Sequence, residues 1–203
     1  MNRILFPVAL AALLGFPGFA LAAGAAGGPL DRPRSPAPVP LGTGTEYATV
    51  VTGSGAPDFA YETLAGGTAR LRDLRAQGDV LLVFGADEAD LRRLQRESER
   101  LTRLGVVPVA VLDWRVGACR EVVRRLSLTF PVVPDRQRAI GAQYNVLDPY
   151  TRQDSPAWFL VDRAGRVRGL DRFELPREAW VNVASTALGL PAEGSSLPAA
   201  STR

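Results

Sequence analysis

The sequence contains no histidine and no lysine, and it has only one cysteine among its 203 residues. Without histidine there is no imidazole base, which excludes a Ser-His-Asp or Cys-His catalytic device built within this chain. One cysteine without histidine also excludes the usual structural and catalytic zinc sites, and a lone cysteine cannot form an internal disulfide. We therefore expect no metal and no cofactor, and the remaining functions rely on one thiol, on carboxylates or on a binding surface.

The basic residues, 24 in all, are arginines interleaved with Asp and Glu, so the formal net charge is only +3. Proteins that bind nucleic acid typically carry a basic stripe with aromatic residues between the charges. No such stripe is visible here. We expect the arginines to form a solvated surface and expect no nucleic-acid partner.

The first 22 residues have the pattern of a secretory signal. Asn2-Arg3 is a short basic start, Ile4–Phe19 is the apolar core, and Ala20-Leu21-Ala22 is a small-residue cleavage site. Pro7, Gly15 and Pro17 within the apolar core disfavour a retained membrane helix. The sequence predicts an exported protein, periplasmic or extracellular, without a membrane span after cleavage.

Composition divides the remainder of the chain into three parts. Residues 23–45 are rich in Pro, Gly and Ala without periodicity, which is typical of a flexible linker. Residues 46–190 have the hydrophobic patterning of one globular domain. Residues 191–203 form a second polar, small-residue stretch, predicted to be a disordered tail.

A strand-helix-strand unit lies at the centre of the domain. Val80–Phe84 is a short apolar run typical of a strand buried on both faces, and Gly85-Ala86 supplies the turn. Asp87 is a good N-cap for a helix that extends to Leu104, with leucines on one stripe. Val106–Leu112 predicts a second strand, parallel to the first.

The flanking segments predict further elements. Pro108 has no N–H, which indicates that its strand lies at or near a sheet edge. The expected elements are a strand at Tyr47–Val51, a hairpin turn at Gly66-Gly67, a helix at Gly117–Leu126, an extended piece at Phe130–Val133, a helical segment at Arg136–Tyr144, a hairpin of Ala157–Asp162 with Arg166–Leu170, and a closing helix at Pro176–Leu188.

Several short blocks in this order resemble the redoxin superfamily of alkyl hydroperoxide reductase/thiol-specific antioxidant proteins and their thioredoxin-like relatives. The resemblance covers roughly residues 53–188 and implies an α/β, thioredoxin-like fold with a mixed central sheet and helices on both faces. The blocks are Ala56–Phe59, Leu64–Leu74, Val80–Phe84, Phe130–Asp135, Ala142–Tyr144 and Trp158–Gly165.

The thiols of that superfamily are absent. Its members place a Thr-x-x-Cys or Cys-x-x-Cys motif just after the strand that matches Val80–Phe84, where this chain has the acidic residues Asp87, Glu88 and Asp90. Pro156 is similar to the cis-proline that faces the active site in thioredoxins, so the resemblance implies a cis bond at Ser155-Pro156.

The resemblance also implies a cleft between two turns. One turn runs from Gly85 to Asp90 and the other is Ser155-Pro156. Trp158 follows two residues later and is either a core residue or an anchor for a partner at this cleft. The acidic cluster is either a helix cap or a cation site, since carboxylates suit Ca²⁺ and Mg²⁺.

Cys119 is the only candidate for thiol chemistry. Its position in the first turn of a helix would lower the thiol pKa. It also shares helical spacing with Val122, Val123 and Leu126, which indicates a buried residue of the apolar stripe. Two functional hypotheses follow. The first is a binding module without thiol catalysis, which meets an unknown protein partner at the cleft. The second is a thiol peroxidase or thiol-disulfide oxidoreductase that acts through Cys119 with an external thiol partner.

Overall fold

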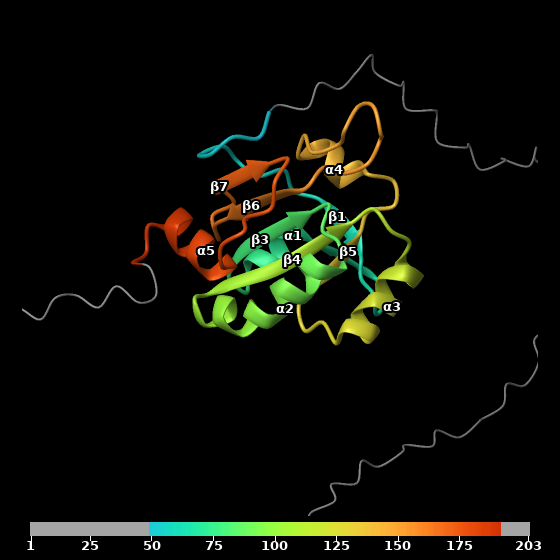
Figure 1. Ribbon diagram of the computed structural model, residues 1–203. Helices are drawn as coiled ribbons and strands as arrows, with labels where there is room; N and C mark the ends of the chain where they lie inside the picture. Colours follow the sequence, from blue (N-terminus) through green and yellow to red (C-terminus); the bar gives the residue numbers. More distant parts are fainter. Residues whose placement is uncertain (1–48, 192–203) are drawn as a thin grey trace, which may run out of the picture. The chain divides into compact units, whose positions relative to one another are not determined.

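The structure, a computed structural model, describes residues 49–191. The predictions for the signal at 1–22, the linker at 23–45 and all but the first residue of the tail lie outside this range. The elements are β1 (Ala60–Glu62), β2 (Thr68–Arg70), α1 (Leu71–Arg75), β3 (Asp79–Phe84), α2 (Glu88–Arg103), β4 (Val106–Leu112), α3 (Val116–Leu126), β5 (Val132–Pro134), α4 (Ala139–Gln143), β6 (Ala157–Val161), β7 (Val167–Arg172) and α5 (Trp180–Leu188) (Figure 1).

A mixed sheet forms the centre of the domain. Its strands lie in the order β5-β4-β3-β6-β7, with β4 parallel to both β3 and β5. The β6 strand is antiparallel to β3 and to β7. A separate hairpin of β1 and β2 turns at Gly66-Gly67, where both glycines have positive φ angles that such a turn requires. The predicted hairpins and the parallel pair are confirmed.

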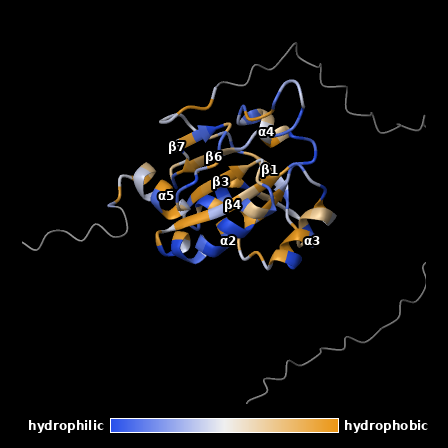
Figure 2. Ribbon diagram, in the orientation of Figure 1, coloured by the Kyte–Doolittle hydropathy of each residue, from blue (hydrophilic) through white to orange (hydrophobic). Residues whose placement is uncertain are grey.

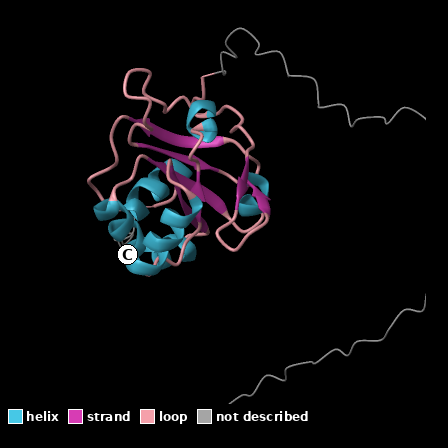
Figure 3. Cartoon of the chain, turned by 90° about the vertical axis from the view of Figure 1, so that its right-hand side faces the viewer, coloured by secondary structure: helices cyan, strands magenta, loops and turns pink. Residues whose placement is uncertain are grey.

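Helices cover both faces of the sheet. Side chains alternate along each strand, so the apolar strands present apolar side chains to both faces, and both must be buried. Leu81 and Val83 of β3 point to a core formed with α2, α3 and α5. Val80, Leu82 and Phe84 point to a second core formed with α1 and α4. Figure 2 shows the central strands in hydrophobic colours, and Figure 3 shows helices on either side of them. The predicted α/β, thioredoxin-like architecture is confirmed.

The strand predicted at Tyr47–Val51 is not present among the residues that the structure describes, which here begin at Thr49. Side chains satisfy this backbone instead of a neighbouring strand. The Val50 N–H donates to Asn145 Oδ1 at 3.0 Å, and Arg172 Nη2 donates to the Val50 carbonyl at 2.6 Å. Because these side chains pair with the backbone groups of Val50, the segment satisfies them without the hydrogen bonds of a neighbouring strand.

Two further predictions need correction. Helix α5 begins at Trp180 rather than at Pro176. The bond at Ser155-Pro156 is trans, since no cis peptide bond occurs in the described part of the chain; trans is the ordinary state of such bonds. The prediction for Pro108 is confirmed: its strand is second from the edge, and the edge strand β5 pairs only with Ala110–Leu112 of it, so that Pro108 has no strand partner on that side within residues 49–191. No helix within residues 49–191 is long and apolar enough to cross a membrane.

Candidate functional site

The junction between β3 and α2 is built on Gly85. Its φ of +60° is a left-handed conformation that side chains rarely adopt. A Cβ at this position would lie 2.8 Å from the Pro156 nitrogen and 2.8 Å from the Ser155 carbonyl carbon. The chain therefore brings the two predicted turns into direct backbone contact, and only glycine fits between them.

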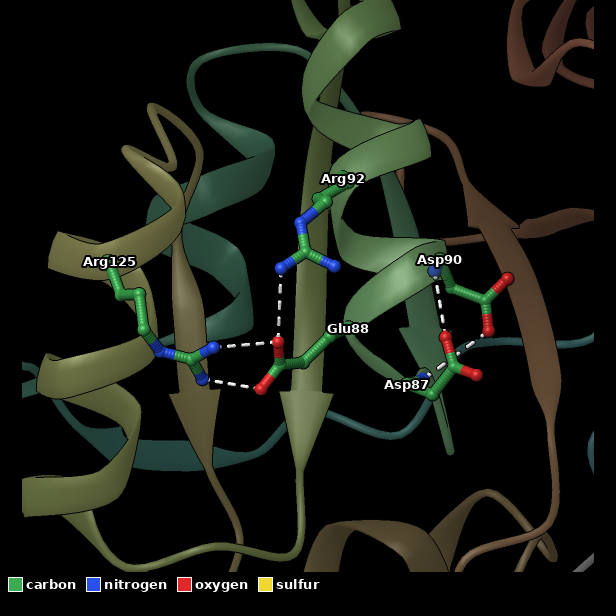
Figure 4. A network of polar contacts seen from close by, with 5 residues as sticks. All are labelled: Asp87, Glu88, Asp90, Arg92 and Arg125. Atoms are coloured by element: carbon green, nitrogen blue, oxygen red, sulfur yellow. Dashed lines mark hydrogen bonds and ion pairs between the residues drawn. The ribbon is translucent and has the colours of Figure 1, made fainter.

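Asp87 and Asp90 cap helix α2. The Asp90 N–H donates to Asp87 Oδ1 at 2.9 Å, and the Asp87 N–H donates to Asp90 Oδ2 at 3.3 Å (Figure 4). This reciprocal pair satisfies two donors that the helix start leaves open. Burial raises the pKa of the Asp90 carboxyl. The helix-cap interpretation of the acidic cluster is confirmed.

Glu88 faces away from this cap and joins two helices. Arg125 at the end of α3 donates to both Glu88 carboxylate oxygens, and Arg92 donates to Oε2 at 3.3 Å (Figure 4). The hydrogen bond from Arg125 is the main reason that the pKa of Glu88 lies below its ordinary value. Glu88 thus holds the start of α2 against α3. No group of His, Cys, Asp and Glu in residues 49–191 gathers closely enough to hold a metal ion.

Cys119 lies in the first turn of α3 with no exposed surface. It is part of the core that includes Val122 and Leu112. Burial, with a smaller contribution from the charge of Asp113, raises the pKa of the thiol to about 11. Desolvation therefore outweighs the effect of the helix N-terminus, and the thiol is protonated at neutral pH. The interpretation of Cys119 as a buried residue is confirmed.

A hollow of about 290 Å³ opens beside the Gly85 turn. Its walls come from three segments: Gly85–Asp87 after β3, Leu112–Trp114 after β4, and Gln153-Asp154 before β6. In open α/β sheets, ligands bind at the carboxyl ends of the strands, and β3 and β4 both end here. We term this hollow the junction hollow. It contains Gly85 and Asp87 of the cleft that the sequence predicted, but its lining does not include Glu88, Asp90, Ser155 or Pro156.

Trp158 does not line the junction hollow. Its side chain packs on the α5 face of the sheet, where a Cβ on Gly169 would lie 3.2 Å from the indole. It lines a separate hollow with Leu175, Pro176 and Val183. The structure thus places Trp158 away from the Gly85 turn, whereas Trp114, at the end of β4, lines the junction hollow.

A larger hollow of about 890 Å³ adjoins the first, and Trp114 lines both. Tyr61 from β1 and the arginines Arg115 and Arg136 contribute to its wall. The two hollows together form a polar groove along the carboxyl ends of β4 and β5. No pattern in the sequence indicated this second part of the groove.

Three aspartates at the groove also escaped the sequence analysis. Asp135 is buried, and its carboxylate accepts N–H groups from Ala139, Ile140 and Gly141 at 2.9–3.0 Å. Asp113 pairs with Arg138 at 3.0 Å. Asp113 and Asp135 directly follow the adjacent strands β4 and β5, and that placement was the available sequence signal.

Asp154, the third aspartate, differs from the other two. Both of its carboxylate oxygens are buried, and neither has a hydrogen-bond partner within residues 49–191. Burial, and then the charges of Asp135 and Asp113, raise the pKa of this carboxyl to about 6. No sequence pattern predicts the buried state of Asp154, because its surroundings are formed by segments that are distant along the chain.

Comparison with known proteins gives a consistent family relationship. The model of the AhpC/TSA family matches residues 52–170. The thiol-disulfide oxidoreductase ResA of Geobacillus kaustophilus is 33% identical over 132 residues, which cover 61% of this chain and 71% of that protein. The ResA protein of Geobacillus thermodenitrificans matches to the same extent.

Solved structures share the fold at lower sequence identity. The peroxidoxin BcpB of Mycobacterium tuberculosis superposes with a TM-score of 0.62 and 18% identity, covering 69% of this chain and 97% of its own. AhpC of Enterococcus faecalis superposes with a TM-score of 0.60 and 16% identity, and the superposition covers 74% of this chain and 99% of that protein. These likenesses concern the fold alone.

Proposed function

The chain belongs to the AhpC/TSA family, and we propose that it is an exported, redoxin-like domain that works by binding a protein partner at the junction hollow, without thiol catalysis. One observation carries this proposal. The strand-helix junction holds the Asp87–Asp90 cap, and the only thiol of the chain is buried elsewhere.

The chemistry at the junction supports binding rather than electron transfer. Carboxylates at a helix N-terminus are stabilised by the dipole, but they cannot form or reduce a disulfide. Within the cap, Asp87 Oδ1 and Asp90 Oδ2 each accept a backbone N–H. What the junction retains is a hollow next to an exposed proline, Pro156, which directly precedes β6.

Export belongs to the same proposal. It rests on the basic start, apolar core and small-residue cleavage site of residues 1–22. A partner would then be another exported or surface protein.

Thiol-disulfide exchange through Cys119 is the second candidate. The 33% identity to a thiol-disulfide oxidoreductase favours it. It requires a thiol that solvent and a second sulfur atom can reach, because exchange proceeds by direct attack of a thiolate. Cys119 has no exposed surface and a raised pKa, so this candidate needs a large opening of α3 before any reaction.

An activity test separates the two candidates. Peroxide consumption with dithiothreitol and reduction of a protein disulfide would be measured for the full chain and for Cys119→Ala. We expect both proteins to match the rate of the protein-free control. Turnover that is present in the wild type and lost in Cys119→Ala would establish the thiol enzyme and refute the proposal.

A binding test addresses the hollow directly. Gln153 lines the hollow with an exposed side chain, so Gln153→Arg would fill the site without disturbing the core. Gln77→Arg makes the same exposed change at the opposite end of β3 and is the matched control. Proteins of the source organism would be cross-linked to the wild type and to each variant. We expect the proteins that cross-link to the wild type to cross-link also to Gln77→Arg and Cys119→Ala, but not to Gln153→Arg. Equal cross-linking by all four proteins would exclude the junction hollow as the binding site.

A further inference from the structure

Three carboxyl groups lie beside the junction hollow, and two of them are held in place by hydrogen bonds. Asp135 accepts three backbone N–H groups at the start of α4. Asp113 accepts hydrogen bonds from Arg138 at 3.0 and 3.3 Å. Asp154 has both oxygens buried without any partner in the described structure. A buried carboxylate without hydrogen bonds is costly, whereas its protonated form is far less so.

Asp154 and Asp135 approach each other at one glycine. Asp135 Oδ2 accepts the Gly141 N–H at 2.9 Å. Asp154 Oδ1 lies only 2.2 Å from the position that a Cβ on Gly141 would take, so it packs directly on the α-carbon. Two carboxyl groups against one residue cannot both ionise without strong repulsion.

The other charges around Asp154 do not offset this repulsion. Asp113 at the end of β4 adds a second negative charge, and Asp87 at the start of α2 lines the same hollow. Among the described residues, Arg138 at the start of α4 is the cation that acts on Asp154, and its guanidinium already pairs with Asp113. Ionisation of Asp154 in this position is therefore opposed by burial and by its neighbours.

Asp154 belongs to a surface segment rather than to a helix or a named strand. The segment is tied by a bridge between Leu147 and Asp154 and by the Ser155 N–H, which donates to the Val146 carbonyl at 2.8 Å. At its tip, the Tyr150 side chain is 93% exposed. Because Asp113 and Asp135 are anchored by hydrogen bonds, this segment is the part that can move when charge appears.

We propose that the protonation state of Asp154 controls closure of the junction hollow. When Asp154 is protonated, segment 147–155 packs against Gly141; when Asp154 is ionised, the segment is released and the wall of the hollow opens. This inference concerns regulation of the site in the proposed function and rests on it for its biological meaning. The carbonyl oxygen of Asp154 also lies 2.9 Å from the position of a Cβ on Gly85, so release of the segment would change the junction turn itself.

The pKa of about 6 places the transition in the mildly acidic range. Below it, the segment is seated and the hollow has the shape seen here. Above it, the seated state is disfavoured. A rise of about two pKa units corresponds to a change of about 10² in the equilibrium constant between the seated and the released segment. Partial solvent exposure reduces this change to about tenfold.

Hydrogen exchange tests this closure on the full chain. The Ser155 amide reports on the segment, because its hydrogen bond to Val146 must break before exchange. After correction for the intrinsic pH dependence, its protection in the wild type should fall about tenfold between pH 4 and pH 8. In Asp154→Asn it should be independent of pH. Asp171→Asn, which neutralises an exposed aspartate on β7, should behave as the wild type does.

Wild-type protection that is equal at both pH values would overturn the proposal, as would the same fall in Asp154→Asn. Should that variant not fold, the carboxyl carbon of Asp154 in the wild type would be followed by NMR. A transition near pH 6 that coincides with the loss of Ser155 protection supports the closure, and a transition below pH 4 overturns it. The measurement uses no ligand, so its failure leaves the binding proposal standing, and failure of the binding test leaves the closure standing.

Discussion

Modification of Cys119 by a thiol reagent should be slow in the native protein, because two independent properties oppose it. At pH 8, a thiol with a pKa of about 11 is ionised to only about 10⁻³. A free thiol with a pKa of about 8.5 is ionised to about 0.2 at that pH, so ionisation alone slows the reaction by on the order of 10².

Burial slows the reaction further. With no exposed surface, Cys119 reacts only after an opening that brings it to solvent. If opening costs about 5 kcal/mol, the low end of ordinary stability, the open fraction is about 10⁻⁴. In the open state the thiol regains its ordinary pKa, so the two factors do not multiply. We expect native labelling to be about 10⁴ times slower than labelling of the unfolded chain.

The assay is the pseudo-first-order rate with an excess of an aromatic disulfide reagent between pH 7 and pH 9. The same protein in concentrated urea supplies the reference rate for an identical sequence. A native labelling rate within tenfold of that reference rate, or an apparent thiol pKa below about 8.5, would refute the assignment of Cys119 as buried. It would favour the second candidate function, thiol chemistry through Cys119.

Substitutions at Cys119 give a matching check on stability. Cys119→Ser places a hydroxyl without a partner in the apolar core, which costs about 1–3 kcal/mol. Cys119→Ala leaves a small space and should cost about 1 kcal/mol. Urea unfolding should therefore rank the wild type above Ala and Ala above Ser. A serine variant more stable than the alanine variant would contradict the apolar surroundings of this residue.

Three further changes test the junction. Asp87→Ala removes the cap of α2 and should lower the unfolding free energy by about 1 kcal/mol, while Asp87→Asn should be nearly neutral in urea unfolding. Gly85→Ala forces a side chain into a left-handed φ and against the Pro156 backbone, so calorimetry should show a loss of at least about 1–2 kcal/mol. Because the pKa of Asp154 is raised to about 6, its contribution to stability is full below about pH 4 and is lost as pH rises through 6. Asp154→Asn should remove that decline, about 1–2 kcal/mol after allowance for partial exposure; an unchanged pH profile would contradict the assignment.

Local patterns in the sequence were sufficient for most of the architecture. The run Val80–Phe84 lies within β3, and the strand predicted at Val106–Leu112 is β4 as observed. The leucine stripe and the Asp87 cap predicted α2 to within a residue. Such elements are predictable because propensity, periodicity and capping act between residues close together in the chain.

The start of α5 depends on contacts with another helix. The sequence favoured Pro176, but the first turn forms at Trp180, where the Val181 N–H donates to Glu97 Oε2 of α2 at 3.2 Å. The Arg93 guanidinium lies 5.3 Å from the centre of the Trp180 ring. A helix start that is capped from another helix carries no local signal.

The candidate site divides in the same way. The absence of a thiol at the junction, the carboxylate cap and the pairing of the Gly85 turn with the Ser155-Pro156 turn were all accessible from the sequence and its resemblance to redoxins. The burial of Cys119, the location of Trp158 and the state of Asp154 were decided by tertiary structure. The physical reason is that desolvation and like-charge repulsion depend on which distant segments pack together, as Gly141 and Asp135 do around Asp154.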